Sequence, residues 1–280
     1  MKAIIPAAGF GTRFLPIAKA VPKEMLPLGN KPVIHHVVQE AAEAGFDEIL
    51  LVISRGKESI VRYFERSPEL EFRLENAGRT AELEELRRVS SMANIHWVYQ
   101  EEMRGLGDAV RHGRDFASDS EIFAVLLGDT VMQGGSPLPG MTAAWQSHRL
   151  PSVCLEPCAA ERVSRYGVAG GEEISAGVHR LDALVEKPEA AAAPRLRDRD
   201  GRLLEHHAFA ARYLFTPEIF SHLEATQTGF GGEIQLTDAM ESLRRTRGLL
   251  GVTWSGRRLD IGRPEGLYEA ARALGLDGRS

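Results

Sequence analysis

The chain begins with an apolar, strand-like segment that leads directly into a glycine-containing, positively charged loop. Residues 2–7 are followed by Gly9 and Gly11, and Arg13 and Lys23 come shortly after them. Glycine lets the backbone approach a ligand closely, so successive N–H groups of such a loop can point at an anion. The first 31 residues carry five cations and one acid, in a chain whose formal net charge is -5. This asymmetry predicts a site for a small polyanion and argues against nucleic acid as a partner.

Two better-known phosphate-binding motifs do not fit this loop. The P-loop has a lysine and then a serine or threonine after its last glycine, whereas Gly11 is followed by Thr12 and Arg13. The dinucleotide fingerprint needs a third glycine at position 14, which is Phe14. The bland alternative, a tight turn from strand to loop with no ligand, is disfavoured by the concentration of positive charge.

The composition is that of an ordinary soluble globular protein. Hydrophobic residues make up 43% and charged residues 26% of 280 positions, which allows a substantial core. No apolar run approaches the eighteen or so residues of a membrane span, so we expect a cytoplasmic protein without a membrane partner. Cys154 and Cys158 have no partnering cysteine or histidine cluster, which favours plain thiols over a zinc site or a disulfide. The nine histidines are interpreted as structural or surface groups.

Apolar runs alternate with helical patterns through the first half, as in a parallel sheet with crossover helices. We predict a helix that begins near Val33 and ends at Gly45, a second over 105–116, and a charged, solvated helix pair within 67–93. The predicted strands of this half are 2–7, 48–53, 95–99 and 122–127. In such a sheet the ligand lies at the carboxyl ends of the strands, where residues 8–13 and Asp129 emerge.

The second half has shorter and less regular strands, and no convincing linker separates it from the first. The predicted strands are 152–156, 166–169, 178–186 and 208–215, and helices are predicted near 217–224, 235–246 and 264–275. We therefore expect a single domain over 1–280. Its fold class is α/β: a doubly wound, mostly parallel, Rossmann-like mixed sheet with helices on both faces, extended after about residue 130 by a lobe over its edge.

Two aspartates follow apolar residues and have glycine beside them. Asp129 ends the run 125–128, and Asp260 stands between Leu259 and the dipeptide 261–262. Magnesium takes one or two protein carboxylates together with phosphate oxygens. Either aspartate alone could be a turn or cap residue, but the pair favours a metal site.

Two further pairs of polar residues leave their roles open. The amide of Gln100 offers a donor and an acceptor to a base edge, and Gly105 opens the following helix with room for a planar ring. Glu186 and Lys187 end another strand, where the acid could accept sugar hydroxyls and the base could hold a phosphate. Taken alone, Gln100 could equally be a loop residue without a ligand, and Glu186 and Lys187 could equally form a surface ion pair.

Taken together, the motifs resemble the sugar-1-phosphate nucleotidylyltransferases, and most of all their bacterial UTP-glucose-1-phosphate uridylyltransferase branch. The resemblance covers about residues 2 to 275. The segments that carry it, in order, are Gly9–Arg13, Pro22–Pro27, Gly105–Gly107, Gly128–Asp129, Tyr166–Val168, Val185–Pro188, Gly232–Asp238 and Asp260–Gly262. The charged excursion at 67–93 also resembles the uridylyltransferase branch.

The resemblance implies a role for each site residue. Ala8, Gly9, Gln100 and Gly105 would contact uracil, and Gly11, Thr12, Arg13 and Lys23 the triphosphate. Asp129 and Asp260 would coordinate Mg²⁺, and Gly167, Glu186 and Lys187 would bind glucose 1-phosphate. About 1–130 would form the nucleotide-binding half, and about 131–280 the sugar-phosphate-binding lobe and C-terminal helices. The implied partners are UTP, a sugar 1-phosphate and further copies of the chain in a homo-oligomer.

The implied reaction is attack by the sugar phosphate on the α-phosphorus of UTP, which releases pyrophosphate, with Arg13, Lys23, Asp129, Lys187 and Asp260 as the catalytic residues. Three positions depart from the family pattern: Ala18 where threonine is usual, Asp108 where histidine is common, and Ala211 where glycine is common. The alternatives are another base or sugar, such as dTTP with glucose 1-phosphate, or a catalytically silent regulator that binds nucleotide sugars.

Overall fold

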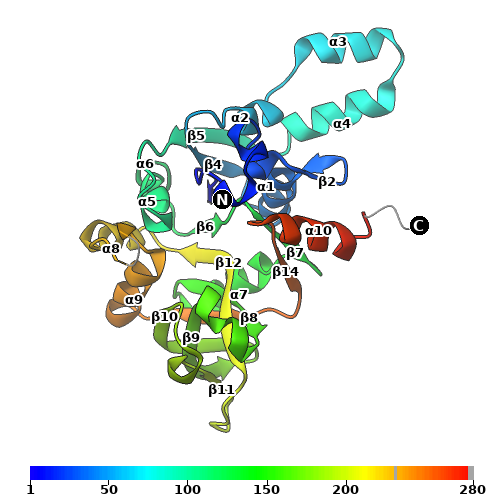
Figure 1. Ribbon diagram of the computed structural model, residues 1–280. Helices are drawn as coiled ribbons and strands as arrows, with labels where there is room; N and C mark the ends of the chain where they lie inside the picture. The colour runs from blue at the N-terminus through cyan, green and yellow to red at the C-terminus, as the bar shows by residue number, and fades with distance from the viewer. Residues whose placement is uncertain (230–231, 277–280) are drawn as a thin grey trace.

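A single ten-stranded sheet runs through both halves of the chain. The computed structural model describes residues 1–229 and 232–276. The strands lie side by side in the order β11-β9-β10-β13-β8-β12-β6-β1-β4-β5 (Figure 1). No helix in the described part of the chain is both long enough and apolar enough to cross a bilayer.

The first half supplies a parallel four-stranded part of this sheet. β1 pairs in parallel with β4 and β6, and β4 pairs in parallel with β5. Because each strand must return to the same edge, helices cross over between strands. The elements of this part are β1 (Lys2–Pro6), α1 (Val33–Glu43), β4 (Glu48–Ile53), α2 (Ser59–Phe64), β5 (Asn94–Tyr99), α5 (Leu106–Arg111), α6 (Arg114–Ala117) and β6 (Phe123–Leu126).

Both faces of the sheet are covered, as the sequence predicted. Alternate residues of β1 point to opposite faces: Ile5 packs in a core with α1, α2 and α7 (Leu138–His148), and Ile4 in a core with α5, α6, α8 (Ile219–Ala225) and α9 (Leu236–Thr246). The doubly wound α/β class with helices on both faces is confirmed.

Beyond β6 the sheet becomes mixed. Its strands are β8 (Ser152–Cys158), β9 (Gly167–Ser175), β10 (Val178–Glu186), β11 (Leu196–Arg197), β12 (His206–Phe215) and β13 (Leu250–Thr253). β12 runs antiparallel to both β6 and β8, and β9 and β10 form a hairpin. A turn as short as Ala176–Gly177 can join only antiparallel strands, and Gly177 adopts the positive φ of 70° that the turn requires. Parallel pairing is therefore less extensive than we predicted.

A separate two-stranded sheet lies beside the main one. β7 (Thr130–Gln133) pairs antiparallel with β14 (Arg257–Asp260), and α10 (Pro264–Ala273) packs on it. Neither strand was predicted, because each is only four residues long and lacks a clear alternating pattern. A small hairpin, β2 (Pro27–Leu28) with β3 (Lys31–Pro32), precedes α1.

The charged excursion forms two helices, α3 (Pro68–Asn76) and α4 (Thr80–Ser90), that project from the body of the molecule (Figure 1). Glu71 of α3 accepts hydrogen bonds from Arg66 and from Arg87 of α4. The predicted helix pair is confirmed.

The prediction of one continuous helix over 105–116 is wrong. The helix is interrupted at His112 and Gly113 and becomes α5 and α6. Glycine is a poor helix former, and here α6 needs it: a side chain on Gly113 would collide with Ile4 of β1. Close packing against the sheet therefore selects a break over a continuous helix.

Candidate functional site

The carboxyl ends of the parallel strands surround a cavity of about 280 Å³. It gathers six of the predicted site residues from five segments of the chain. These are Ala8, Gly9, Lys23, Gln100, Gly105 and Asp129, and Pro6, Ala7, Glu24, Met103, Leu106, Ala109, Leu127 and Glu233 complete the lining. The structure therefore brings these six predicted residues together around one cavity.

A buried ion pair supports the glycine loop from below. The ammonium of Lys57 donates to the carbonyl of Ala7 at 2.7 Å and to the carboxylate of Glu24 at 2.8 and 3.0 Å. The hydroxyl of Ser54 donates to the carbonyl of Ala8 at 2.7 Å. Since two consecutive carbonyls point away from the cavity into these donors, the loop keeps its other face free for a ligand.

Burial moves both members of this pair toward their neutral forms. It raises the pKa of Glu24, against the charge of Lys57, and it lowers the pKa of Lys57, against the charge of Glu24. Sequence reasoning missed Glu24 and Lys57. Their only signals were the place of Glu24 inside the Pro22–Pro27 motif and that of Lys57 just beyond a predicted strand.

Lys23 and Asp129 form an ion pair at the mouth of the cavity, with Nζ 2.5 Å from Oδ2. Burial disfavours the charged form of Lys23, but the carboxylates of Asp129, Glu24 and Asp260 outweigh it and raise the pKa of the ammonium. Burial likewise disfavours charged Asp129, but Lys23 outweighs it and lowers the pKa of the carboxyl. Both groups therefore stay ionised at neutral pH.

Gly262 lies between the two predicted metal-binding carboxylates. A methyl group on Gly262 would lie 3.0 Å from Oδ1 of Asp260 and 3.6 Å from Oδ2 of Asp129, with the guanidinium of Arg13 at 3.8 Å. The glycine thus leaves open a small space that both carboxylates and Arg13 border. Two carboxylates that face one space suit a magnesium ion completed by phosphate oxygens. The residues present therefore fit the predicted ion, and the described part of the chain has no cluster of three or more such ligands.

The amide of Gln100 is held in one orientation. Its Nε2 donates to Oδ2 of buried Asp108 at 2.8 Å and to the carbonyl of Gly105 at 3.2 Å. Because a carboxylate accepts only, the amide nitrogen must face Asp108 and the oxygen remains for a ligand. We expected Gln100 to offer a donor and an acceptor; the geometry leaves the acceptor.

A second cavity of about 160 Å³ adjoins the first, since Leu106 and Leu127 line both. It is lined by Gly167 and Glu186, together with Arg165, Tyr166, Phe209, Ala211, Tyr213, Gln235, Leu236, Thr237 and Arg258. Thr237 donates to the carboxylate of Glu186 at 2.7 Å. The Gly232–Asp238 motif therefore contributes to this cavity, a role that the sequence did not specify.

The remaining predicted residues do not line these two cavities, and Asp260 lines a third one together with Arg258 and Tyr166. Gly11 has φ 64° and leads into the 3-10 turn Thr12–Phe14, and Thr12 and Arg13 are exposed. Lys187 also has a positive φ, 47°, and its backbone N–H donates to Tyr166 at 3.0 Å.

A cavity at the carboxyl edge of a doubly wound sheet, with paired carboxylates and a cationic glycine loop, is typical of a nucleotide-using transferase. Residues 2–275 match the nucleotidyl transferase family, and the chain belongs to it. Members of this family typically use a divalent metal ion. The resemblance found in the motifs is confirmed.

Within the family, the chain is similar to a UTP–glucose-1-phosphate uridylyltransferase of Bacillus subtilis, with 41% identity over 93% of this chain and 86% of the relative. It also resembles the structure of a UDP-glucose pyrophosphorylase complexed with UDP-glucose, with a TM-score of 0.84, 36% identity and 98% of both chains covered. The structure of a UTP-bound enzyme from Acinetobacter baumannii has a TM-score of 0.88 and 32% identity, covering 100% of this chain and 94% of that one.

Proposed function

We propose that this protein transfers the uridylyl group of UTP to glucose 1-phosphate, giving UDP-glucose and pyrophosphate. The observation that carries the proposal is the convergence of Lys23, Asp129 and Gln100 on one cavity next to a second cavity that contains Glu186. In this proposal the amide of Gln100 reads the base, Lys23 binds phosphate, and the carboxylate of Glu186 in the adjoining cavity accepts sugar hydroxyls. The uridylyltransferases among its relatives support the same reading.

The residues have to bring two polyanions into line, because the attacking phosphate is already anionic and no protein nucleophile is needed. In our proposal the loop of Ala8, Gly9, Gly11 and Thr12 binds the nucleotide through backbone N–H groups. Arg13 and Lys23 hold the triphosphate and stabilise charge on the departing pyrophosphate.

At the acceptor side, Glu186 accepts hydroxyls of the sugar and Lys187 holds its phosphate in line with the α-phosphorus. Gly167 lines the same cavity as Glu186, and a side chain there would collide with Phe209. Gln100 reads the base by accepting the N3–H of uracil, and Gly105 leaves room for the ring.

Asp129 and Asp260 would hold the metal ion, which we propose to be Mg²⁺. When bound, it would act as a Lewis acid that offsets negative charge on the reacting phosphates. The cytoplasmic location and the homo-oligomeric state expected from the sequence stay predictions.

The test is pyrophosphate release by the purified protein with Mg²⁺. UTP, dTTP, CTP, ATP and GTP are each combined with the 1-phosphates of glucose, galactose and N-acetylglucosamine. We expect the highest kcat/KM for UTP with glucose 1-phosphate. Preference for dTTP or for another sugar would correct the substrate, and binding without release in every combination would indicate a silent regulator.

A further inference from the structure

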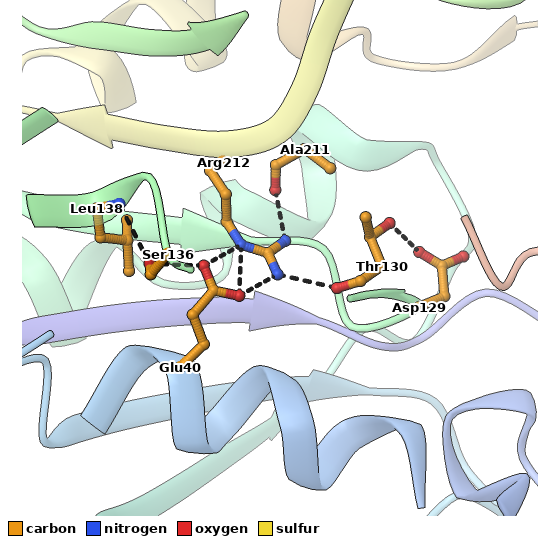
Figure 2. Close-up of polar contacts among 7 residues, drawn as sticks. All are labelled: Glu40, Asp129, Thr130, Ser136, Leu138, Ala211 and Arg212. Carbon is orange, nitrogen blue, oxygen red and sulfur yellow. Dashed lines mark hydrogen bonds and ion pairs between the residues drawn. The ribbon is translucent and has the colours of Figure 1, made fainter. Parts of the chain in front are cut away.

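A fully buried arginine, Arg212, lies between the main sheet and the small β7–β14 sheet. It stands on β12 with none of its surface exposed. Its Nε and Nη2 contact the carboxylate of Glu40 on α1 at 2.6 to 3.2 Å, and Ser136 donates to the same carboxylate at 2.9 Å (Figure 2). The buried charge is therefore fully compensated.

Two further N–H groups of Arg212 donate to backbone carbonyls. Nη1 donates to Ala211 and Nη2 to Thr130, both at 2.9 Å. Thr130 is the first residue of β7 and directly follows Asp129, as Figure 2 shows. Arg212 thus joins the strand that follows Asp129 to both α1 and the main sheet.

The same strand also determines where Asp260 lies. Asp260 pairs with Thr130 in the β7–β14 ladder, and the N–H of Ile261 donates to the carbonyl of Asp129 at 2.9 Å. Asp260 therefore lies in the small sheet, and Asp129 lies in the turn that joins β6 of the main sheet to β7. Because Thr130 adjoins Asp129 and pairs with Asp260, a shift of Thr130 relative to the main sheet would change the position of both carboxylates relative to the nucleotide loop.

Stability alone does not explain an arginine at this place, since well-packed apolar residues often replace buried ion pairs without loss. The planar fork of arginine can bind a carboxylate and two carbonyls at fixed angles, which lysine cannot do. We infer that Arg212, held by Glu40, is a positioning residue that keeps the carboxylate pair of Asp129 and Asp260 in place relative to the nucleotide loop for the metal ion. The inference rests on the proposed function, which assigns the metal to these carboxylates.

The experiment compares metal binding by the wild type, Arg212→Lys and the double variant Arg212→Met with Glu40→Gln. The double variant removes both buried charges together, so neither is left unpaired. If one of the two variants fails to fold, metal binding can still be measured on the other. Leu214→Ala is the matched control, because Leu214 is buried on the same strand but faces the core. Mn²⁺ binding is measured from the electron paramagnetic resonance signal of free Mn²⁺ at saturating UDP-glucose, and unfolding is followed in parallel.

We expect both Arg212 variants to bind Mn²⁺ about tenfold more weakly, the lower end of the effect of losing a direct partner of a metal ligand, because Arg212 acts through Thr130. The Mg²⁺ concentration that gives half-maximal turnover should rise similarly, while the KM for glucose 1-phosphate changes less than about threefold. Leu214→Ala should lose stability but keep its Mn²⁺ affinity.

Unchanged Mn²⁺ affinity in the Arg212 variants, or an equal loss in Leu214→Ala, would overturn the inference and leave Arg212 a structural residue. A wild type that binds no Mn²⁺ would overturn it too. The proposed function fails on a different result, namely no pyrophosphate release by the wild type in any substrate combination.

Discussion

One hydrogen bond decides what Gln100 can offer a pyrimidine. Because Asp108 takes the amide nitrogen, the oxygen is left to accept from the ligand. Uracil carries a donor at N3, and cytosine carries an acceptor there, so this orientation favours UTP over CTP. Asp108 is also one of the positions that depart from the family pattern, so a substitution at this position tests whether it orients Gln100.

Asp108→Asn should reduce the preference for UTP. An asparagine can donate as well as accept, so Gln100 would no longer be confined to one orientation. We expect the ratio of kcat/KM for UTP to that for CTP to fall about tenfold, the value of one hydrogen bond of about 1.4 kcal/mol. Gln100→Ala should weaken UTP binding about fivefold to a hundredfold, while glucose 1-phosphate binding is little changed.

The matched control is Asp115→Asn, because Asp115 is an exposed acid on the neighbouring helix α6. If Gln100→Ala lowers the ratio and Asp108→Asn does not, Asp108 has no part in orienting the amide. If neither changes it, uracil is read by backbone groups around Ala8 and Gly105.

Asp129→Asn should lower turnover about a hundredfold or more with the fold retained. The substitution keeps the size of the side chain but removes the charge proposed to hold Mg²⁺. The assay measures turnover against Mg²⁺ concentration, with circular dichroism as the check on folding. Activity near that of the wild type at limiting Mg²⁺ would remove Asp129 from the metal site.

The site residues that the sequence could predict are those whose chemistry is visible locally. Asp129 and Gln100 each follow an apolar run that reads as a strand, and the carboxyl edge of a parallel sheet brings such residues together. Asp108, Lys57 and Arg212 could not be predicted, because their roles depend on partners that only the folded backbone places beside them.

Two sequence motifs meet where α5 begins. The N–H of Gly107 donates to the carbonyl of Ile234 at 2.9 Å, and the N–H of Ile234 donates to Arg104 at 2.7 Å. A β-carbon on Gly107 would lie 2.7 Å from that carbonyl oxygen. The glycine thus allows the segment before α9 to close against the start of α5.

Gly107→Ala should therefore destabilise the protein by about 1–3 kcal/mol, because a backbone group has to move. Gly140→Ala makes the same change within helix α7, where the nearest atom to the new carbon is 3.9 Å away. It should stabilise by about 0.5–1 kcal/mol, since alanine is the better helix former. Denaturant unfolding measures the change in the free energy of unfolding of each variant. Changes of the same sign in both variants would contradict the close packing at Gly107.

Helices and long strands could be predicted because their periodicity extends over many residues. The strands β7 and β14 could not, since four residues give too little pattern, and β14 begins with two arginines. β9 runs to Ser175, well past the predicted end at 169, because its pairing with β10 continues through charged residues.

The continuous ten-stranded sheet makes the two halves of the molecule interdependent. β12, from the second half, lies between β6 and β8, with all but the first of its ten residues buried. This arrangement supports the sequence prediction of one domain over 1–280, which remains a prediction for unfolding experiments.

UDP-glucose with Mg²⁺ should raise the temperature of one cooperative unfolding transition. At a hundred times its Kd a ligand adds about 2.7 kcal/mol, which for a chain of this length corresponds to a shift in Tm of about 5 °C. Differential scanning calorimetry measures this shift. The control is the protein with glucose in buffer that contains no UTP. Two transitions, of which only one shifts, would contradict a single domain.

The position of β14 in the chain has a consequence for how the protein is made. Asp129 and Asp260 are 131 positions apart in the sequence, and the small sheet that joins them needs a strand that is synthesised after every strand of the main sheet. A nascent chain can therefore complete its whole scaffold and its nucleotide loop while it still lacks half of its carboxylate pair. The carboxylate pair would then be completed only after the residues that line the nucleotide cavity have been synthesised.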